Sequence, residues 1–182
     1  GRAFASPVIE AQAAFRAVLQ ALAEPGTITS VPAPLDVCPG FSSAMTALAL
    51  TLADFETSIW TDAGTDAESY LRFHTGAPVV ASPASAALAF VTKAIRMAPL
   101  ATFAPGTLDY PDQSTTLLID VEALEQVGAW TLSGPGIDGT RALSAAPLPS
   151  DFTQQFQANR KRFPCGVDVV FCAGTRIAGL PR

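Results

Sequence analysis

Residues 114–124 read STTLLIDVEAL, and they form the most apolar strand-like stretch of the chain. Its apolar side chains follow one another almost without interruption, whereas a strand with one solvated face alternates apolar and polar residues. The stretch therefore predicts a strand that is buried on both faces, in the middle of a sheet. Because both faces of such a sheet must be covered, the stretch favours an α/β fold with helices on each side.

Helix signals lie on both sides of this stretch in the sequence. Ser6-Pro7 suits the start of a helix and Pro25-Gly26 its end, because Ser caps a helix, Pro fits its first turn and Pro-Gly stops it. We expect three more helices, over residues 42–53, 66–74 and 150–163. The apolar face of the first helix is predicted from its spacing to carry Phe15, Val18, Leu19 and Leu22.

Short runs of β-branched, aromatic and aliphatic residues predict the other strands, and the C-terminal stretch predicts a hairpin that turns at Ala173-Gly174. Short helices thus alternate with strands and hairpins, without an internal repeat or a linker. We expect one domain over residues 1–182, a three-layer α/β/α sandwich with a mixed sheet. Besides 114–124, the predicted strands cover 27–31, 57–61, 77–80, 86–92, 129–134 and the two arms of 166–182.

The composition limits the classes of molecule that the chain is expected to bind. The 182 residues include 11 Lys and Arg against 16 Asp and Glu, and the net charge of −5 disfavours nucleic acid and anionic membranes. Hydrophobic residues make up 49% and charged residues 15%, which suggests that another copy or another protein covers some apolar surface. A composition rich in Ala and Pro explains the same figures without a partner, and both readings stay open.

The cysteines and the apolar runs bear on location and metal binding. The three cysteines are odd in number and lack CxxC spacing, and with a single histidine they do not form a local zinc motif. No apolar run approaches the roughly 20 residues that span a bilayer, and no signal segment is apparent. We therefore expect a cytoplasmic protein that holds neither a metal nor a membrane span.

Familiar catalytic motifs do not occur: the chain lacks GxSxG, GxGxxG and GxxxxGK[ST]. Two cationic groups remain, Arg72 with His74 and the run Arg160-Lys161-Arg162 at the end of the last predicted helix. Arg72, His74 and Arg162 are our candidates for binding an anionic ligand. A charge run at a helix end is otherwise explained by the helix dipole, and a single histidine by a structural hydrogen bond.

Arg72 and His74 point about 200° apart on a regular helix, so they cannot share one ligand there. We expect the last turn to unwind at Phe73, because a Gly and a Pro follow, so that Phe73 enters the core and the two side chains converge. In the alternative, His74 caps the last helix carbonyls and Arg72 pairs with Asp66 or Glu68.

Several stretches of the sequence, in order and over nearly the whole chain, resemble the PhnH family, subunits of the bacterial carbon–phosphorus lyase system. Cys38 and Cys165, and the short tail after Leu180, depart from the family pattern without affecting a predicted role. The stretches that carry the resemblance are AFRAVLQALAEPGTI (14–28), LRFHTGAP (71–78), TTLLIDV (115–121), LSGPGI (132–137) and FPCGVDVVFCAGTRIAGLPR (163–182).

The resemblance implies a fold related to the large domain of pyridoxal phosphate (PLP)-dependent transferases, without that cofactor. It implies a homodimer, and a place in a core complex with PhnG-, PhnI- and PhnJ-type subunits. That complex forms ribose 1-phosphonate 5-triphosphate from ATP and a phosphonate, a transferase step usually ascribed to the PhnI-type subunit. This chain is then expected to be an accessory subunit that is not catalytic alone and needs no cofactor.

Two other functions stay open from the sequence. A free-standing protein could hold a phosphonate or ATP through Arg72 and His74. A PLP-dependent transferase would need a buried lysine, and Lys93, after a predicted strand, is the position to inspect.

Overall fold

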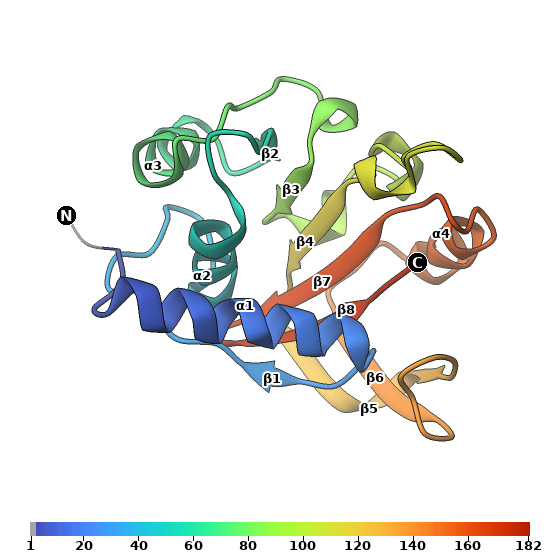
Figure 1. Cartoon of the computed structure of the whole chain (residues 1–182). Helices are drawn as coiled ribbons and strands as arrows, with labels where there is room; N and C mark the ends of the chain where they lie inside the picture. Colours follow the sequence, from blue (N-terminus) through green and yellow to red (C-terminus); the bar gives the residue numbers. More distant parts are fainter. Residues whose placement is uncertain (1–2) are drawn as a thin grey trace.

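β4 (Thr116–Asp120), from the apolar stretch quoted above, lies inside a six-stranded mixed sheet (Figure 1). The computed structural model describes residues 3–182 of the chain. β4 pairs in parallel with β3 (Leu88–Val91) on one side and with β7 (Asp168–Ala173) on the other. Its three central residues are fully buried. The predicted α/β class and the burial of this strand on both faces are thus confirmed.

The sheet is parallel through its centre and antiparallel toward one edge. β2 (Ile59–Thr61) extends the parallel part beyond β3. On the other side β8 (Arg176–Leu180) runs antiparallel to β7, and β1 (Thr29–Ser30) runs antiparallel to β8. The resulting order is β1-β8-β7-β4-β3-β2. The β7–β8 hairpin turns at Gly174, where a φ of 60° suits glycine, as the sequence predicted.

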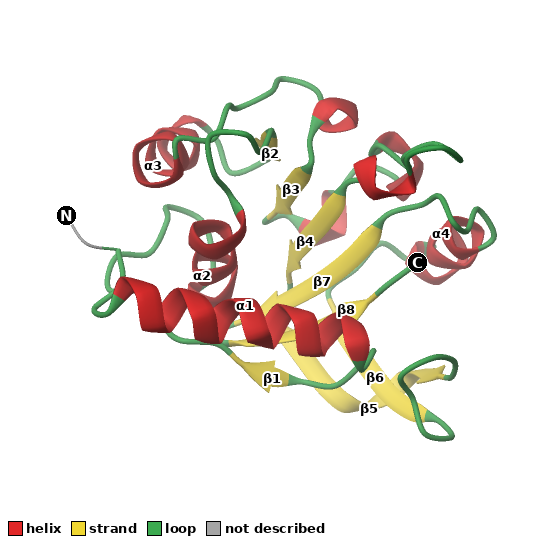
Figure 2. Cartoon of the chain, in the orientation of Figure 1, coloured by secondary structure: helices red, strands yellow, loops and turns green. Residues whose placement is uncertain are grey.

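Three helices cover one face of the sheet (Figure 2): α1 (Pro7–Ala23), α2 (Ser43–Leu52) and α3 (Thr65–Thr75). α2 begins as predicted, because the Ser42 hydroxyl accepts a hydrogen bond from the backbone N–H of Met45 (3.0 Å). Side chains from all three helices form one core cluster with the facing side chains of the sheet.

The face that α1 turns toward the sheet differs in part from the predicted one, since Val18 is buried and Leu22 packs against the core as expected. Its buried residues are Ala14, Ala17, Val18 and Ala21. Phe15 and Leu19, expected on that face, remain 47% and 52% exposed. The physical reason is a close approach of helix and sheet: a Cβ on Gly179 of β8 would lie 2.5 Å from the Ala21 carbonyl oxygen. Only small side chains fit at so short a separation, so alanines take most of the inner face, and Phe15 and Leu19 point outward.

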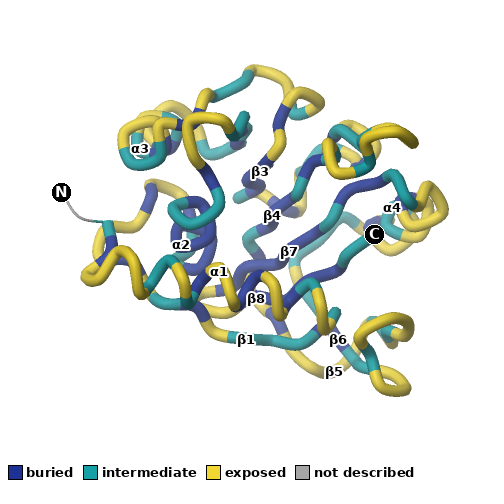
Figure 3. The backbone as a smooth tube through the Cα atoms, viewed as in Figure 1, coloured by how far each residue is buried: buried dark blue, intermediate teal, exposed yellow. Residues whose placement is uncertain are grey.

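The other face is covered by a mixed layer. α4 (Phe152–Arg160) packs there beside a separate two-stranded antiparallel sheet of β5 (Ala123–Leu132) and β6 (Arg141–Ala146). The outer side of β5 is largely exposed (Figure 3). Four 3-10 helices connect the strands: Pro83–Ser85, Ala94–Arg96, Leu100–Thr102 and Pro111–Gln113.

The quoted stretch 114–124 is not one strand. After Asp120 the backbone changes partners: the N–H of Val121 donates to Cys172 of β7, whereas the N–H of Glu122 donates to Ala146 of β6, both at 2.9 Å. The chain leaves the main sheet between these two residues and enters the β5–β6 sheet. β6 was not predicted, and the strand expected at 77–80 is reduced to a bridge between Val79 and Ile59.

Within residues 3–182, no helix has both the length and the apolar character that crossing a membrane requires.

Candidate functional site

The carboxyl ends of the parallel strands form the edge where open α/β sheets usually bind ligands. Here we call this edge the carboxyl edge, and it consists of Ser42, Asp62, Thr92, Lys93 and Asp120. Asp62 directly follows β2, Thr92 and Lys93 follow β3, and Asp120 ends β4. Ser42, at the N-terminus of α2, reaches the same edge through its contact with Asp120.

Asp120 is partly buried and tied to the start of α2. Its carboxylate accepts hydrogen bonds from the Ser42 backbone N–H (2.8 Å) and from the Ser42 hydroxyl (2.5 Å). Burial, together with a smaller contribution from the charge of Asp62, raises the pKa of Asp120 to about 6, although the hydrogen bonds from Ser42 act in the opposite direction. The carboxyl group therefore exchanges its proton near neutral pH, unlike an ordinary aspartate.

Asp62 ties the end of β2 to the end of β3. One carboxylate oxygen accepts hydrogen bonds from the backbone N–H and the hydroxyl of Thr92, each at 2.7 Å. The other accepts from the backbone N–H of Lys93 at 3.1 Å. Both carboxylates of the carboxyl edge are thus occupied by neighbours from this chain. Their arrangement holds loops and a helix start in place.

Sequence reasoning did not single out Asp62 or Asp120. A signal was present, because each aspartate stands at the end of a buried strand, where polar side chains of parallel strands gather at one edge. Lys93 also lies at this edge, but its side chain is exposed. It therefore lacks the buried setting that a Schiff-base lysine requires.

The predicted convergence of Arg72 and His74 is wrong. α3 stays helical through Thr75 and ends at Gly76, whose φ of 71° supplies the predicted stop. Phe73, expected in the core, is 74% exposed, since no turn unwinds to bring it inward. The side chains of Arg72 and His74 therefore keep their helical directions and do not share a ligand.

Each member of that pair has a partner of its own. Arg72 lies 3.9 Å from the Glu68 carboxylate on the exposed side of α3, which is one of the pairings considered in the alternative. His74 Nε2 lies 3.7 Å from the carboxylate of Asp36, and its ring packs against Tyr70 with centroids 4.2 Å apart. His74 therefore does not cap the last carbonyls of the helix.

Arg162 lies far from this pair in the fold. It is exposed and follows α4, which packs on the opposite face of the sheet from α3. It lines a depression of about 160 Å³ beside Leu100 and Asn159. The structure thus places the predicted site residues in separate places and does not assemble them into one site.

Cys38 and Cys172 are buried and have no features of nucleophiles. Burial raises the pKa of the Cys38 thiol to about 12, with a smaller contribution from the charge of Asp36. Burial also raises the pKa of Cys172 well above its ordinary value. A nucleophilic cysteine needs a lowered pKa and access to solvent, so both act as small apolar residues.

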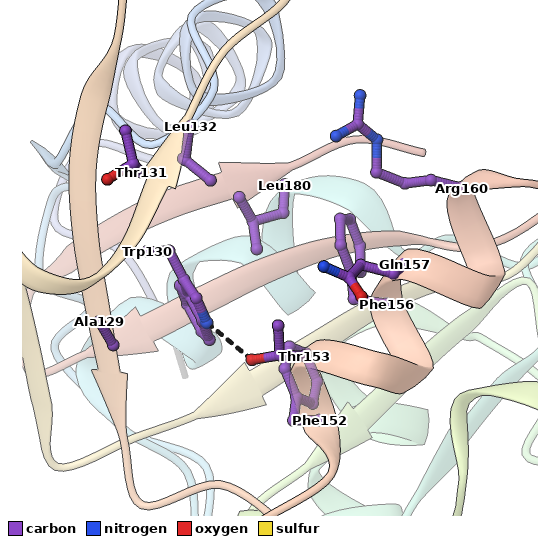
Figure 4. Close-up of a pocket in the computed structure, with 10 residues that line it drawn as sticks. All are labelled: Ala129, Trp130, Thr131, Leu132, Phe152, Thr153, Phe156, Gln157, Arg160 and Leu180. Carbon is purple, nitrogen blue, oxygen red and sulfur yellow. Dashed lines mark hydrogen bonds between the residues drawn. The ribbon is translucent and has the colours of Figure 1, made fainter.

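A groove lies between β5 and α4, on the side of the sheet that α4 covers. Figure 4 shows Trp130 and Leu132 of β5 on one side, Phe156, Gln157 and Arg160 of α4 on the other, and Leu180 of β8 between them. This lobe holds about 260 Å³ and adjoins a second of about 110 Å³. The lobes share Leu132, Phe156, Arg160 and Leu180, and we call them together the hairpin groove.

Comparisons with known proteins all find similarity to proteins named for phosphonate metabolism or C-P lyase. Residues 2–182 match the family described as bacterial phosphonate metabolism protein (PhnH). A protein of Rhizobium meliloti (strain 1021), named alpha-D-ribose 1-methylphosphonate 5-triphosphate synthase subunit PhnH, is 38% identical over 189 residues, which cover 99% of this chain and 92% of the relative. HtxG of Stutzerimonas stutzeri, named as a putative C-P lyase subunit protein, is 30% identical over 77 residues, 42% of this chain and 40% of the relative.

Proposed function

Since this chain belongs to the PhnH family, we propose that it is an accessory subunit of the carbon–phosphorus lyase core complex. It would be needed to form ribose 1-phosphonate 5-triphosphate from ATP and a phosphonate. The observation that carries the proposal is the similarity to the Rhizobium meliloti synthase subunit over 99% of this chain. The proposed unit is a single PhnH-like domain over residues 1–182.

The outer face of α1 supports a role in an assembly. Val8, Phe15 and Leu19 lie one above another on this face at helical spacing, and they are 70%, 47% and 52% exposed. We call these three residues the α1 outer stripe. Contiguous apolar surface on a chain with few charges marks a contact with another protein. The proposed partners are a second copy of this chain and the PhnG-, PhnI- and PhnJ-type subunits, in the cytoplasm and without nucleic acid or a membrane.

The carboxyl edge supports placing the chemical step in another subunit. Asp62 and Asp120 accept hydrogen bonds from their own chain, and Lys93 is exposed. In this interpretation the two carboxylates serve mainly to hold the fold together. In the proposal this chain positions partners or substrates and carries out no chemistry alone, with neither a metal nor PLP.

Two finer points belong to the proposal. The fold is proposed to be related to the large domain of PLP-dependent transferases, which an experimental structure and its superposition would test. Arg72, His74 and Arg162 stay predictions as contacts to a ligand or partner, each acting separately because the fold keeps them apart.

The second candidate function is a free-standing protein that binds a nucleotide or a phosphonate. The observation in its favour is the hairpin groove, which lies open on the surface of the single chain. Size-exclusion chromatography of lysate from cells that express all subunits separates the two candidates. The accessory role requires co-elution with the other subunits, whereas the free-standing role predicts elution alone.

The decisive experiment measures adenine released from ATP in the presence of methylphosphonate. We expect release by the complete set of subunits, and a loss of at least about tenfold when this chain is left out. The chain alone is expected to release none above background. Full activity without this chain would contradict the accessory role, and adenine release by the chain alone would contradict the placement of the chemistry elsewhere.

A further inference from the structure

The hairpin groove has walls that are held in place before any ligand arrives. The Trp130 indole stacks on Phe171 with centroids 5.9 Å apart and an interplanar angle of 23°. Its N–H donates to the Thr153 hydroxyl at 2.9 Å, a bond that Figure 4 draws as a dashed line. Phe156 stacks on Phe152 with an interplanar angle of 11°. Aromatic rings fixed in this way offer flat apolar surface at little cost in conformational entropy.

The charged side chains that line the groove are all basic. Arg160 lines both lobes, and with Lys161 it lines an adjoining depression; Arg182 lines the second lobe. No Asp or Glu lines either lobe or that depression, although acidic residues outnumber basic ones in the chain, 16 to 11. Such a local excess of positive charge attracts an anion in spite of the net negative charge of the protein.

The basic side chains of the groove differ in whether they already form ion pairs or hydrogen bonds within the chain. Arg182 is engaged with Asp168 at 3.1 Å and with several backbone carbonyls. Arg160 and Lys161 are exposed, and neither makes an ion pair or a side-chain hydrogen bond with any residue in the range 3–182. Gln157, one turn before Lys161, is also exposed, and its amide offers both a donor and an acceptor. The groove thus combines flat apolar walls with unpaired polar and cationic groups at its rim.

We infer that the hairpin groove binds a nucleoside triphosphate, with the base against Trp130 and Phe156 and the phosphates at Arg160 and Lys161. A planar guanidinium suits phosphate oxygens, and an aromatic wall suits a base. The lobes of about 260 and 110 Å³ are at the small end of ligand pockets, which fits a site that holds a base and leaves the phosphates at the surface.

The choice of ATP among ring-bearing anions rests on the proposed function, in which ATP is a substrate of the complex. The aromatic walls of the groove pack on the face of the sheet opposite α1, while Pro25, just after α1, borders the second lobe. A subunit that docks through α1 would therefore leave the groove open to nucleotide. In this arrangement the chain brings ATP to the complex and does not act only as a scaffold.

Titration calorimetry with the intact chain tests the inference. We expect saturable binding of ATP, and affinities at least about tenfold weaker for adenosine and for inorganic triphosphate, because each keeps half of the contacts. Arg160→Ala should weaken ATP binding about tenfold, since it removes a charge-assisted bond to phosphate. Arg96→Ala removes the same charge from an exposed site outside the groove and should leave the affinity unchanged.

Fluorescence locates the base. Trp60→Phe leaves Trp130 as the single indole of the chain, and ATP should change the emission of that variant while inorganic triphosphate should not. Absence of saturable ATP binding up to about 1 mM, a weak affinity by the scale of enzyme substrates, overturns the inference. Equal binding of ATP and inorganic triphosphate also overturns it, because a patch that binds phosphate without the base would then explain the affinity. Equal weakening by Arg96→Ala and Arg160→Ala overturns it too, because the overall electrostatic field of the protein would then explain the binding.

Measuring adenine release by the assembled complex distinguishes a failure of this inference from a failure of the proposed function. If the complex needs this chain, and Arg160→Ala raises the KM for ATP, both stand. If the complex needs the chain but Arg160→Ala leaves KM unchanged, the nucleotide site is wrong and the accessory role remains. If the chain binds ATP but the complex works fully without it, the accessory role is wrong and the site remains. If Arg160→Ala instead prevents assembly, the groove contacts protein and the inference is wrong.

Discussion

The carboxyl edge and the hairpin groove both carry charged side chains, but they use them in opposite ways. At the carboxyl edge, Asp62 accepts hydrogen bonds from Thr92 and Lys93, which follow β3. Asp120 accepts hydrogen bonds from Ser42, which precedes α2. At the groove, Arg160 and Lys161 extend into solvent without a partner in the described chain. The first region uses its charges to hold the fold together, and the second leaves them available.

This contrast assigns different consequences to mutations in the two regions. A polar group that is satisfied within the fold contributes to stability, and its loss leaves its partners unpaired. An exposed charge without a partner contributes little to stability, so its loss is detected only when a ligand or another subunit is present. Residues at the carboxyl edge should therefore change the free energy of unfolding, and residues of the groove should change binding.

The largest expected effect is the pH dependence caused by Asp120. Its pKa is about 6 in the folded chain against an ordinary value of 3.8, so the folded state binds the proton more tightly. The contribution of Asp120 to the free energy of unfolding is therefore largest below pH 3.8. It decreases as the pH rises through 6, by up to about 3 kcal/mol in total. Chemical denaturation of wild type and Asp120→Asn between pH 4 and 8 measures this difference.

Asp120→Asn has no titrating group at this position, so its stability should lack that component of the pH dependence. The comparison uses the difference between the two curves, which removes the contribution of the other carboxylates. Parallel curves for the two proteins would show that Asp120 has an ordinary pKa and that burial does not govern it.

The next largest effect is expected from Asp62→Ala. The substitution removes, at the end of β2, the acceptor for two backbone N–H groups and one hydroxyl that follow β3. We expect the free energy of unfolding to drop by about 2 kcal/mol, or Tm by about 4–8 °C. Asp109→Ala removes an exposed carboxylate without such bonds and should have almost no effect. Similar melting curves for Asp62→Ala and wild type would contradict the assigned structural role.

A smaller effect on stability is expected at the α1 outer stripe, which represents a third kind of surface. Phe15→Ser combined with Leu19→Ser changes side chains that are already about half exposed, so the free energy of unfolding should change by less than about 1 kcal/mol. Co-purification with the other subunits should nevertheless be lost, because apolar contact area is removed. Gln20→Ser, exposed and polar on the same helix, is the control. Unchanged assembly of the double variant would exclude α1 as a docking surface.

The smallest effects on stability are expected from Arg160→Ala and Arg72→Ala. Arg160 has no partner to lose, and Arg72 has only an exposed ion pair at 3.9 Å. Each should change the free energy of unfolding by less than about 0.5 kcal/mol, within the range of exposed ion pairs. A drop of Tm by several degrees for Arg160→Ala would remove the contrast between the two regions, because the groove would then be part of the structural frame.

Local patterns were enough for elements whose residues specify their own conformation. The apolar run in β4 predicted a buried strand, the sequence predicted a helix over residues 42–53, and Gly76 predicted the end of α3. Each signal depends on side chains or φ angles within a few residues. β6 escaped prediction, because its sequence RALSAA, residues 141–146, carries no strand pattern and its pairing with β5 supplies the conformation.

The candidate site was less predictable because its members come together only through the fold. The cationic residues selected from the sequence, Arg72, His74 and Arg162, belong to different surfaces. Trp130 and Arg160, which form the groove together, are 30 positions apart in the sequence and on different elements. No spacing rule joins a residue of β5 to a residue of α4, since their proximity depends on how both pack against β7 and β8.

The sequence by itself determined the α/β class, the buried central strand, the ends of most helices and the resemblance to the PhnH family. These depend on the hydrophobic period, on residues that start or stop helices, and on short stretches of sequence that can be recognised without knowing their neighbours in space. Tertiary structure alone decided which face of α1 is buried, where the chain leaves the main sheet after Asp120, and which charges stay unpaired. The physical reason is that burial, strand pairing and charge pairing are properties of two segments in contact, and a single segment does not specify its neighbour.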